Sequence, residues 1–273
     1  MTILAARSLR RRPRIVVSER SSYWMRRRDP LWVRLFERVY RYSDAQIAQT
    51  RRVADRLAQD TGSRNVRVIP NAVRTDLTGI GPRVRPEDTL AEDQKVILLV
   101  GSKPRVKGFD IALEAFKTFL EGRPDDDWRL VILGLPVDHA FNRTIAEAPV
   151  AAHVLTTGPV SNMADWYSRA DIVILPSRHE GMPNALMEAM ALGRPVIAAD
   201  CETGPAELIE DGVNGLLVPV EDARALAQAL SKLADDPSRA SRLARAATSI
   251  AEDHRPERIY LMWEETLSGR KAA

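Results

Sequence analysis

The sequence predicts an α/β fold with a six-stranded, doubly wound parallel sheet, and two patterns over residues 95–248 carry this prediction. Six short runs are nearly continuous in apolar residues, as strands buried on both faces of a sheet must be. Amphipathic stretches of helical period separate these runs. Strands that alternate with helices form a parallel sheet with helices on both faces. The expected strands are 95–101, 128–134, 153–158, 171–177, 194–200 and 215–220.

The helices between these strands carry their own start and stop signals. Apolar residues spaced along one helix face follow the first strand, from Ile111 to Leu120. Ser161 and Asp222 are placed as N-caps, and Pro205 suits the first position of a short helix. Gly193 fits the C-terminal cap of the helix that precedes the fifth strand.

The remainder of the chain is less regular. Three strand-like runs and two helix-like runs precede residue 78, which is too little for a complete open sheet. The segment after them is rich in Gly, Pro and charge, as linkers are. We therefore expect a partial domain at 1–77, a linker at 78–94, a complete domain at 95–248 and a C-terminal helical segment at 249–273.

Composition and charge narrow the class of protein. No apolar run reaches about 18 residues, so no transmembrane helix is expected, and the basic N-terminal stretch lacks the apolar segment of a secretory signal. Cys201 is the one cysteine, so a cytoplasmic location without disulfides is expected. Residues 1–60 hold 15 Arg and Lys against 6 Asp and Glu, whereas the rest holds 25 against 31. Nucleic acid, an anionic membrane or plain solubility would each explain the basic end.

The expected topology indicates where a ligand binds. In the common strand order 3-2-1-4-5-6, a crevice opens between strands 1 and 4 at their carboxyl ends. Strand 1 ends at Gly101 and strand 4 ends at Pro176. The loops that follow them therefore bring Lys107 and Glu180 to the same crevice.

The loop after strand 4 runs directly into a helix. Gly181 permits close approach of the backbone to a ligand, and Pro183 suits a first helical turn. The N–H groups and the positive dipole end of that helix would cradle a diphosphate, with Lys107 as the opposing charge. Glu188 shares a helix face with Asn184, and its carboxylate suits the hydroxyls of a ribose.

Several motifs in these segments resemble one enzyme family, the retaining GT-B glycosyltransferases of family 4, group 1. The resemblance covers roughly residues 15–268 and implies two Rossmann-like domains, the C-terminal one complete and the N-terminal one partial. The C-terminal helix of such proteins crosses back to the first domain. The motifs are VIPNAV (68–73), VKGFDIALEAF (106–116), TGPVSNMADWYSRADIVILPS (157–177), the E-x7-E pair Glu180 and Glu188, and GPAELIEDGVNGLLVP (204–219).

The resemblance implies roles for individual residues. Lys107 would contact the diphosphate, Glu188 would hold the ribose, and Glu180 would act near the donor sugar or the acceptor. Lys107 and Glu180 are thus the expected catalytic residues, with retention of anomeric configuration and no metal or other cofactor. Backbone that lines the phosphates, the sugar and the base would come from Gly158, Val160, Gly181, Met182, Pro183 and Asn184.

Two departures from the family pattern bear on activity. Ser102 stands where the family often has an arginine, and Lys103 or Arg105 is the nearest substitute charge, so Ser102 and Arg105 join the expected donor site. An ordinary member has roughly a hundred more residues at its N-terminus, which build most of the acceptor-binding domain. We therefore expect an N-terminally truncated chain, and a complementing partner chain could supply the acceptor half.

Two functions follow from the resemblance. The first is transfer of a sugar, with UDP-sugar as the expected donor, to a glycan or lipid-linked glycan. SER (18–20) and TGPAELI (203–209) resemble members that extend lipid-linked or surface oligosaccharides. The second is non-catalytic binding of a nucleotide sugar by a fragment that needs a partner chain. The intact E-x7-E pair argues against a third function, sugar-nucleotide epimerisation.

Some features have a plainer interpretation beside a functional one. Residues 23–42 mix aromatics with six arginines and could lie on the inner face of an anionic membrane, although a buried helix with a basic solvent face is favoured. The aspartates at 125–127 could suggest a metal site, but a solvated turn is favoured. His179 adjoins Glu180, yet its position needs only a loop residue. Nucleic acid is not expected as a partner, because no matching fold motif is present.

Overall fold

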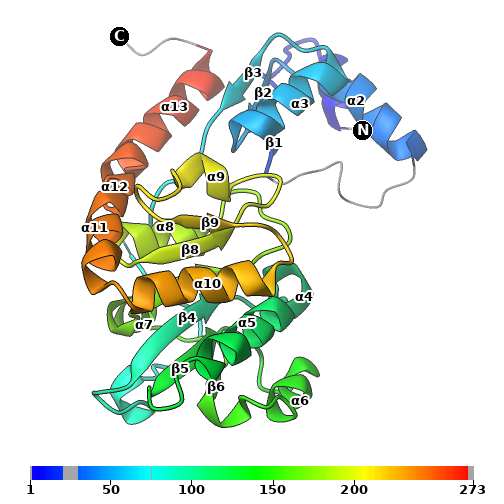
Figure 1. Cartoon of the computed structure of the whole chain (residues 1–273). Coiled ribbons are helices and arrows are strands. Elements are labelled where there is room, and N and C mark those ends of the chain that lie inside the picture. Colours follow the sequence, from blue (N-terminus) through cyan, green and yellow to red (C-terminus); the bar gives the residue numbers. More distant parts are fainter. Residues whose placement is uncertain (1, 21–29, 75, 270–273) are drawn as a thin grey trace. The chain divides into compact units, whose positions relative to one another are not determined.

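The computed structural model describes residues 2–20, 30–74 and 76–269, which fall into two compact units. The first unit comprises residues 1–72, 180–182 and 254–273, and the second comprises residues 73–179 and 183–253. Each unit holds one parallel sheet (Figure 1). Within the described residues, no helix has both the length and the apolar character needed to cross a bilayer.

The sheet of the second unit has the predicted strand order. Its strands are parallel and lie in the order β6-β5-β4-β7-β8-β9, which is 3-2-1-4-5-6 along the chain. Each strand lies within a predicted run, so the doubly wound sheet is confirmed. The bounds are β4 Lys95–Val100, β5 Trp128–Leu133, β6 Val154–Thr157, β7 Ile172–Leu175, β8 Val196–Ala199 and β9 Leu216–Val218.

Burial on both faces explains the continuous apolar runs. In β4, Ile97 and Leu99 belong to the core beneath α5 and α10, whereas Val96 and Leu98 are equally buried and point to the opposite face. Figure 1 shows α5 and α10 on one face of the sheet and α7 and α8 on the other. The helical elements of this unit are η2 Pro86–Asp88, α4 Pro104–Lys107, α5 Phe109–Glu121, α6 Phe141–Ala146, η3 Ala151–His153, α7 Met163–Arg169, α8 Asn184–Ala191, α9 Pro205–Leu208, α10 Ala223–Ala234, α11 Pro237–Ala247 and α12 Ile250–Asp253.

Three of the predicted helix ends are confirmed. The Asp222 carboxylate accepts a hydrogen bond from the Ala225 N–H at 2.8 Å and caps α10. Pro205 is the first residue of α9. Gly193 follows α8 with a φ of 61°, the left-handed conformation that a helix C-terminus favours.

The prediction that Ser161 caps α7 is wrong. The helix begins at Met163, and Asn162 is the residue before it. The backbone of Ser161 is engaged elsewhere, because its N–H donates to the Pro82 carbonyl at 3.0 Å and its carbonyl accepts from the Gly79 N–H at 2.8 Å. Pairing with this earlier segment postpones the start of the helix.

The first unit has a smaller parallel sheet in the order β1-β2-β3. Ile47 of β2 packs with Ile69 and with Ile259 of the C-terminal helix, and Thr50 caps α3 by accepting from the Val53 N–H at 3.3 Å. The elements are α1 Thr2–Arg7, β1 Val16–Glu19, α2 Pro30–Tyr40, β2 Ala45–Ala48, α3 Arg51–Thr61, β3 Val66–Val68 and α13 Pro256–Ser268.

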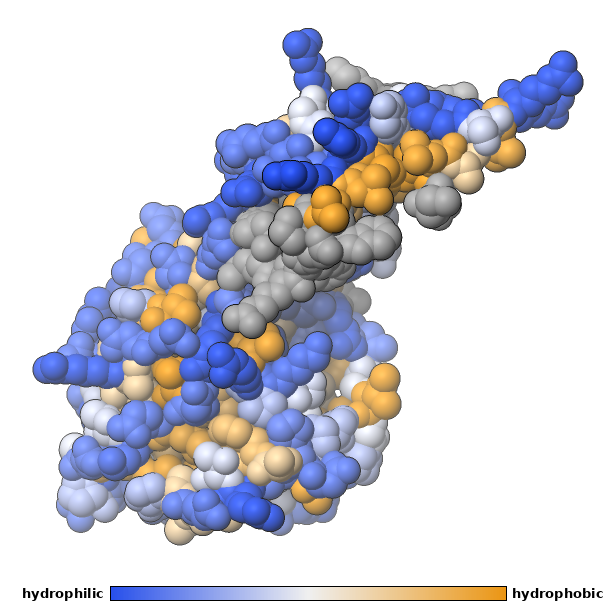
Figure 2. Space-filling model, turned by 90° about the vertical axis from the view of Figure 1, so that its right-hand side faces the viewer, coloured by the Kyte–Doolittle hydropathy of each residue, from blue (hydrophilic) through white to orange (hydrophobic). Residues whose placement is uncertain are grey.

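Helix α2 carries the described part of the segment considered for membrane contact, residues 23–42. Residues 23–29 lie outside the described residues. No described side chain of α2 is fully buried: Val33, Phe36, Val39 and Tyr40 are half-buried, whereas Leu31 and Leu35 are 70% and 49% exposed. Figure 2 shows apolar surface beside strongly hydrophilic surface on the part of the molecule that carries α2. Contact with a membrane stays a prediction.

Candidate functional site

The loops that follow β4 and β7 meet at the carboxyl edge of the six-stranded sheet. The Arg178 N–H donates to the Val106 carbonyl at 2.9 Å, and the Arg178 guanidinium donates to the Arg105 carbonyl at 2.8 Å. Because strand order reverses between β4 and β7, this edge is where open α/β sheets bind ligands. The geometry therefore brings together the two loops that the sequence singled out.

Gly108 fixes the position of Lys107 at this edge. It ends α4 with a φ of 64°, and a Cβ atom here would lie only 2.0 Å from the Pro176 carbonyl oxygen at the end of β7. A Cβ atom on Gly101 would in turn lie 2.8 Å from Lys107 Cγ. The half-buried Lys107 stem therefore lies over the end of β4, beside the end of β7.

Ser102 and Arg105 lie in the same loop but face different surroundings. Both are exposed and line an open groove of about 610 Å³, together with His139 and Thr144. Lys107 does not line this groove. Ser102 and Arg105 therefore line this groove, whereas Lys107 lies over the end of β4.

The loop between β7 and α8 runs directly into the helix, as the sequence predicted. Pro183 is the residue before α8 and has an extended backbone, while Asn184 is the first helical residue and is exposed. No side chain caps this helix start. Its first N–H groups point to the carboxyl edge of the sheet, where an anion would meet the positive end of the helix dipole.

Gly181 has a structural reason for being glycine. Residues 180–182 belong to the first compact unit, and a Cβ atom on Gly181 would lie 2.5 Å from the Arg20 carbonyl oxygen. The Asn71 N–H also donates to the buried Met182 Sδ at 3.1 Å. The sequence assigned the glycine to close approach of a ligand, whereas these contacts show close approach of other backbone.

Glu188 of α8 is buried, with only 5% of its surface exposed. The Tyr167 hydroxyl donates to Glu188 Oε2 at 2.9 Å, and the Arg74 guanidinium lies 3.5 Å from Oε1. Burial raises the pKa of the Glu188 carboxyl, while the Tyr167 hydrogen bond and the Arg74 charge act to lower it. Burial and the neighbouring carboxylate raise the pKa of Tyr167 well above its usual value, which keeps the hydroxyl a donor.

Sequence reasoning missed both partners of Glu188. Tyr167 lies in α7 and reads as an ordinary core aromatic, since its hydroxyl gives no sign in the sequence of where it points. Arg74 directly follows the VIPNAV motif, in a segment without regular structure. Only the fold brings these two residues to the same carboxylate.

The predicted base-reading loop contains Gly158 and Val160. The Gly158 carbonyl accepts from the Gly134 N–H at 3.2 Å, and the Val160 side chain is buried. A Cβ atom on Gly79 would lie 1.9 Å from the Val160 carbonyl oxygen, so residues 78–82 lie directly against this loop. The glycines of the expected linker are therefore explained by close backbone packing.

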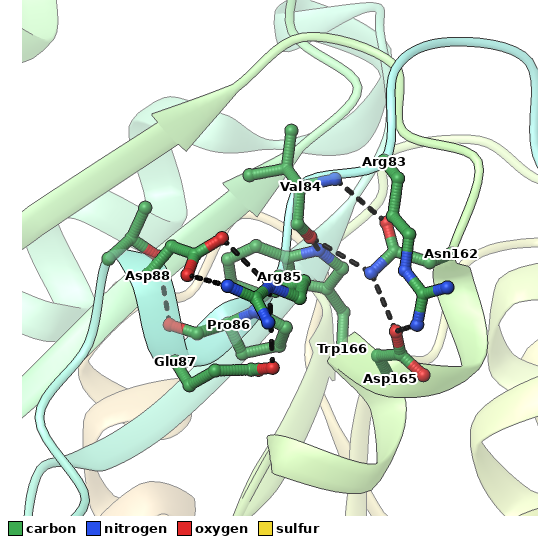
Figure 3. A network of polar contacts seen from close by, with 10 residues as sticks. Arg83, Val84, Arg85, Pro86, Glu87, Asp88, Asn162, Asp165 and Trp166 are labelled. Carbon is green, nitrogen blue, oxygen red and sulfur yellow. Dashed lines mark hydrogen bonds and ion pairs between the residues drawn. The ribbon is translucent and has the colours of Figure 1, made fainter.

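The rest of this segment is anchored to α7, as Figure 3 shows. The Asn162 side chain accepts from the Val84 N–H at 3.1 Å and donates to the Val84 carbonyl at 2.9 Å. The Trp166 indole N–H donates to the same carbonyl at 2.9 Å. Val84 is therefore tied to the domain that carries the predicted base-reading loop.

Arg178 joins the loop after β7 to the first turn of α5 and to the loop after β9. Its guanidinium donates to both Asp110 oxygens, at 2.8 and 2.7 Å, and to Glu221 at 2.7 Å. This bidentate contact holds the pKa of Asp110 below its usual value. Glu221 has a φ of 61°, the one left-handed backbone among the described residues other than glycine. The ion pair thus holds a strained residue beside the Lys107 loop.

The plainer interpretations of two other features agree with their surroundings. Asp125, Asp126 and Asp127 are exposed in the turn before β5, and Asp127 pairs with Arg129 at 2.7 Å. No group of acidic, His or Cys side chains within the described ranges is arranged to hold a metal ion. His179 is exposed.

Comparison with known families gives two matches. Residues 94–236 match the model of the "Glycosyl transferases group 1", and residues 1–77 match that of "Glycosyltransferase Family 4". A D-inositol 3-phosphate glycosyltransferase from Xylanimonas cellulosilytica is 35% identical over 79% of this chain and 54% of its own length. The lipopolysaccharide core biosynthesis mannosyltransferase LpsB of Rhizobium meliloti is 30% identical over 97% of this chain and 76% of its own. The chain spans about half the length of several curated relatives that it matches.

Solved structures give the same fold. Anabaena Alr3699/HepE in complex with UDP aligns with a TM-score of 0.82 at 22% identity, covering 98% of this chain and 76% of that one. Sucrose-phosphate synthase from Thermosynechococcus elongatus aligns with a TM-score of 0.77 at 22% identity, covering 93% and 67%. The predicted GT-B fold is thereby confirmed.

Proposed function

Because the chain belongs to the group 1 glycosyl transferases, we propose that it takes part in transfer of a sugar from a UDP-sugar to a glycan or lipid-linked glycan, with retention of configuration. The proposal that the chain binds the donor rests on one observation: the Lys107 loop contacts the loop that precedes α8. UDP as the carrier is supported by the UDP complex of the HepE structure, and a lipid-linked acceptor by the lipopolysaccharide pathway of LpsB.

In this proposal, the diphosphate lies between Lys107 and the amino end of α8. The lysine ammonium neutralises charge that develops on the leaving phosphate oxygen as its bond to the sugar breaks. The N–H groups at Asn184 and Ala185 bind the same phosphates. Glu188 accepts hydrogen bonds from the ribose hydroxyls, and Glu180 acts near the sugar. These positive groups supply the charge that a metal ion supplies elsewhere, so no metal is part of the proposal.

Calorimetry with UDP-glucose and GDP-mannose tests donor binding by the full chain. We expect Lys107→Ala to weaken UDP-glucose binding at least about tenfold, because it removes a charge-assisted contact of about 1.5–3 kcal/mol. Lys232→Ala is the matched control, because Lys232 is exposed on α10 and far along the chain from both loops. Absence of binding by any nucleotide sugar would contradict the proposal.

A second function, binding of a nucleotide sugar without catalysis, has one observation in its favour. The described part of the first unit has a three-stranded sheet, whereas the second unit has six strands. Incubation of the chain with UDP-glucose and lipid-linked oligosaccharide, followed by analysis for released UDP, separates the two functions. Binding without UDP release would favour a fragment that needs a complementing chain, whereas release with a retained anomer favours the enzyme.

A further inference from the structure

Glu188 is held differently at its two carboxylate oxygens. Oε2 receives a hydrogen bond from a hydroxyl that is itself fully buried, that of Tyr167. Oε1 faces the Arg74 guanidinium at 3.5 Å, and the Arg74 side chain is 44% exposed. One oxygen is therefore fixed by the protein interior, while the other faces a group that solvent reaches.

We propose that Tyr167 and Arg74 are positioning residues, which orient Glu188 and keep it ionised so that Oε1 accepts the hydroxyls of the donor pentose. This inference rests on the proposed function. Tyr167 fixes the rotation of the carboxylate, because a bond to Oε2 leaves Oε1 as the oxygen that points away from α7. Arg74 supplies an opposite charge without filling both lone pairs of Oε1, so the oxygen can still accept a ligand hydroxyl.

Two ionisable residues, Tyr167 and Arg74, act on the charge of Glu188. Helices α11 and α12 and strands β7 and β8 also pack against α8. Among the described residues, Tyr167 and Arg74 are the ionisable groups that act on Glu188, and both favour its charged form against the effect of burial. Removal of either should therefore let burial raise the pKa of Glu188 further.

A protonated carboxyl is a poor acceptor for a pentose hydroxyl, so donor affinity should fall as pH drops through the pKa of Glu188. In Tyr167→Phe, this fall should occur at a higher pH than in the unaltered chain. UDP-glucose is the suitable probe, because both of its phosphates are esterified and do not titrate in this range. A purely structural role for Tyr167 would instead weaken binding by the same factor at every pH.

The experiment is calorimetry of UDP-glucose binding between pH 5 and pH 9. We expect Tyr167→Phe to weaken binding about fivefold at pH 8, the value of one hydrogen bond, and by a larger factor at the acid end of this range. Arg74→Gln should move the pH profile in the same direction. Glu188→Gln should bind weakly with no inflection, and in that background Tyr167→Phe and Arg74→Gln should have no further effect. Tyr260→Phe and Arg224→Gln, at exposed positions, are matched controls.

Three outcomes overturn parts of this inference separately. If UDP-glucose does not bind the unaltered chain, both the proposed function and the inference fail. If UDP-glucose binds, but Tyr167→Phe weakens binding equally at all pH values or still weakens it in the Glu188→Gln background, only the role of Tyr167 is overturned. If Arg74→Gln still weakens binding in that background, Arg74 acts on the donor directly and not through Glu188. Because Arg74 is half exposed, its variant gives a result even if Tyr167→Phe does not fold.

Discussion

Gly108→Ala offers a direct test of how the Lys107 loop is held. Gly108 has a φ of 64°, and a methyl group here would lie 2.0 Å from the Pro176 carbonyl oxygen. Gly212 has a similar φ of 74° but nothing within 4 Å of the position of a Cβ atom. Gly212→Ala is therefore a matched control that carries the backbone cost without the collision.

The expected magnitude follows from these two contributions. A left-handed backbone costs an L-residue about 1–2 kcal/mol, which both variants bear. In Gly108→Ala, the two loops must also separate by about 1 Å to reach ordinary contact, which breaks the 2.9 Å bond between Arg178 N and the Val106 carbonyl. With about 1–2 kcal/mol for that bond and its lost packing, the total destabilisation is about 2–4 kcal/mol.

Thermal unfolding followed by circular dichroism, with UDP-glucose calorimetry on the same samples, measures both effects. Because the two variants differ by an additional ~1–2 kcal/mol, at about 2–4 °C per kcal/mol Gly108→Ala should unfold about 2–8 °C below Gly212→Ala. It should also bind UDP-glucose at least about tenfold more weakly, because Lys107 moves with the loop. Equal unfolding temperatures for the two variants would refute the packing argument, and unchanged binding in a destabilised Gly108→Ala would refute the role of the loop.

Two further predictions concern charge. Arg178→Gln should reduce the loss of stability that the protein shows as pH falls. The Asp110 pKa is depressed in the folded state, so the ionised Asp110 stabilises the fold at pH values above its unfolded pKa of about 3.9. This contribution is lost as pH falls through the lower folded pKa. Unfolding temperatures at pH 3 and pH 7 check this prediction, with Arg224→Gln as the control. If the unfolding temperature falls equally between pH 7 and pH 3 in both variants, the prediction is contradicted. The chain should also sediment with vesicles that contain anionic lipid, and Leu31→Ser with Leu35→Ser should reduce this binding several-fold, because both leucines are exposed beside arginines on α2. Equal binding to neutral vesicles would contradict this prediction.

The six-stranded sheet could be predicted because each strand is encoded locally. Runs such as KVILLV and DIVIL are apolar at successive positions, and burial of both Ile97 and Leu98 in β4 shows why a fully covered strand needs that pattern. Strand order followed from a general rule for alternating strands and helices. Ser161 failed as a cap because pairing with a segment about 80 residues earlier overrode the local signal.

Only the part of the candidate site that follows from the sheet topology could be predicted. The carboxyl ends of β4 and β7 placed Lys107 and the start of α8 at one edge, but side-chain direction within a loop is not encoded in spacing. Arg105 is two residues from Lys107, yet Arg105 lines the groove beside His139 and Lys107 does not. The partners of Glu188 are Arg74 and Tyr167, which are distant from it in the sequence, so no local pattern indicated them.

The neighbours of Glu188 on α8 support a ligand-binding role over a structural one. Leu186, Met187 and Met190 are apolar side chains buried on the same helix. A fourth apolar side chain at position 188 would fill the same space, whereas a carboxylate there pays for desolvation and needs both a buried hydroxyl and a cation to stay charged. The burial of this charge, with Tyr167 bonded to Oε2 and the half-exposed Arg74 facing Oε1, supports our proposal that Oε1 receives hydrogen bonds from a ligand.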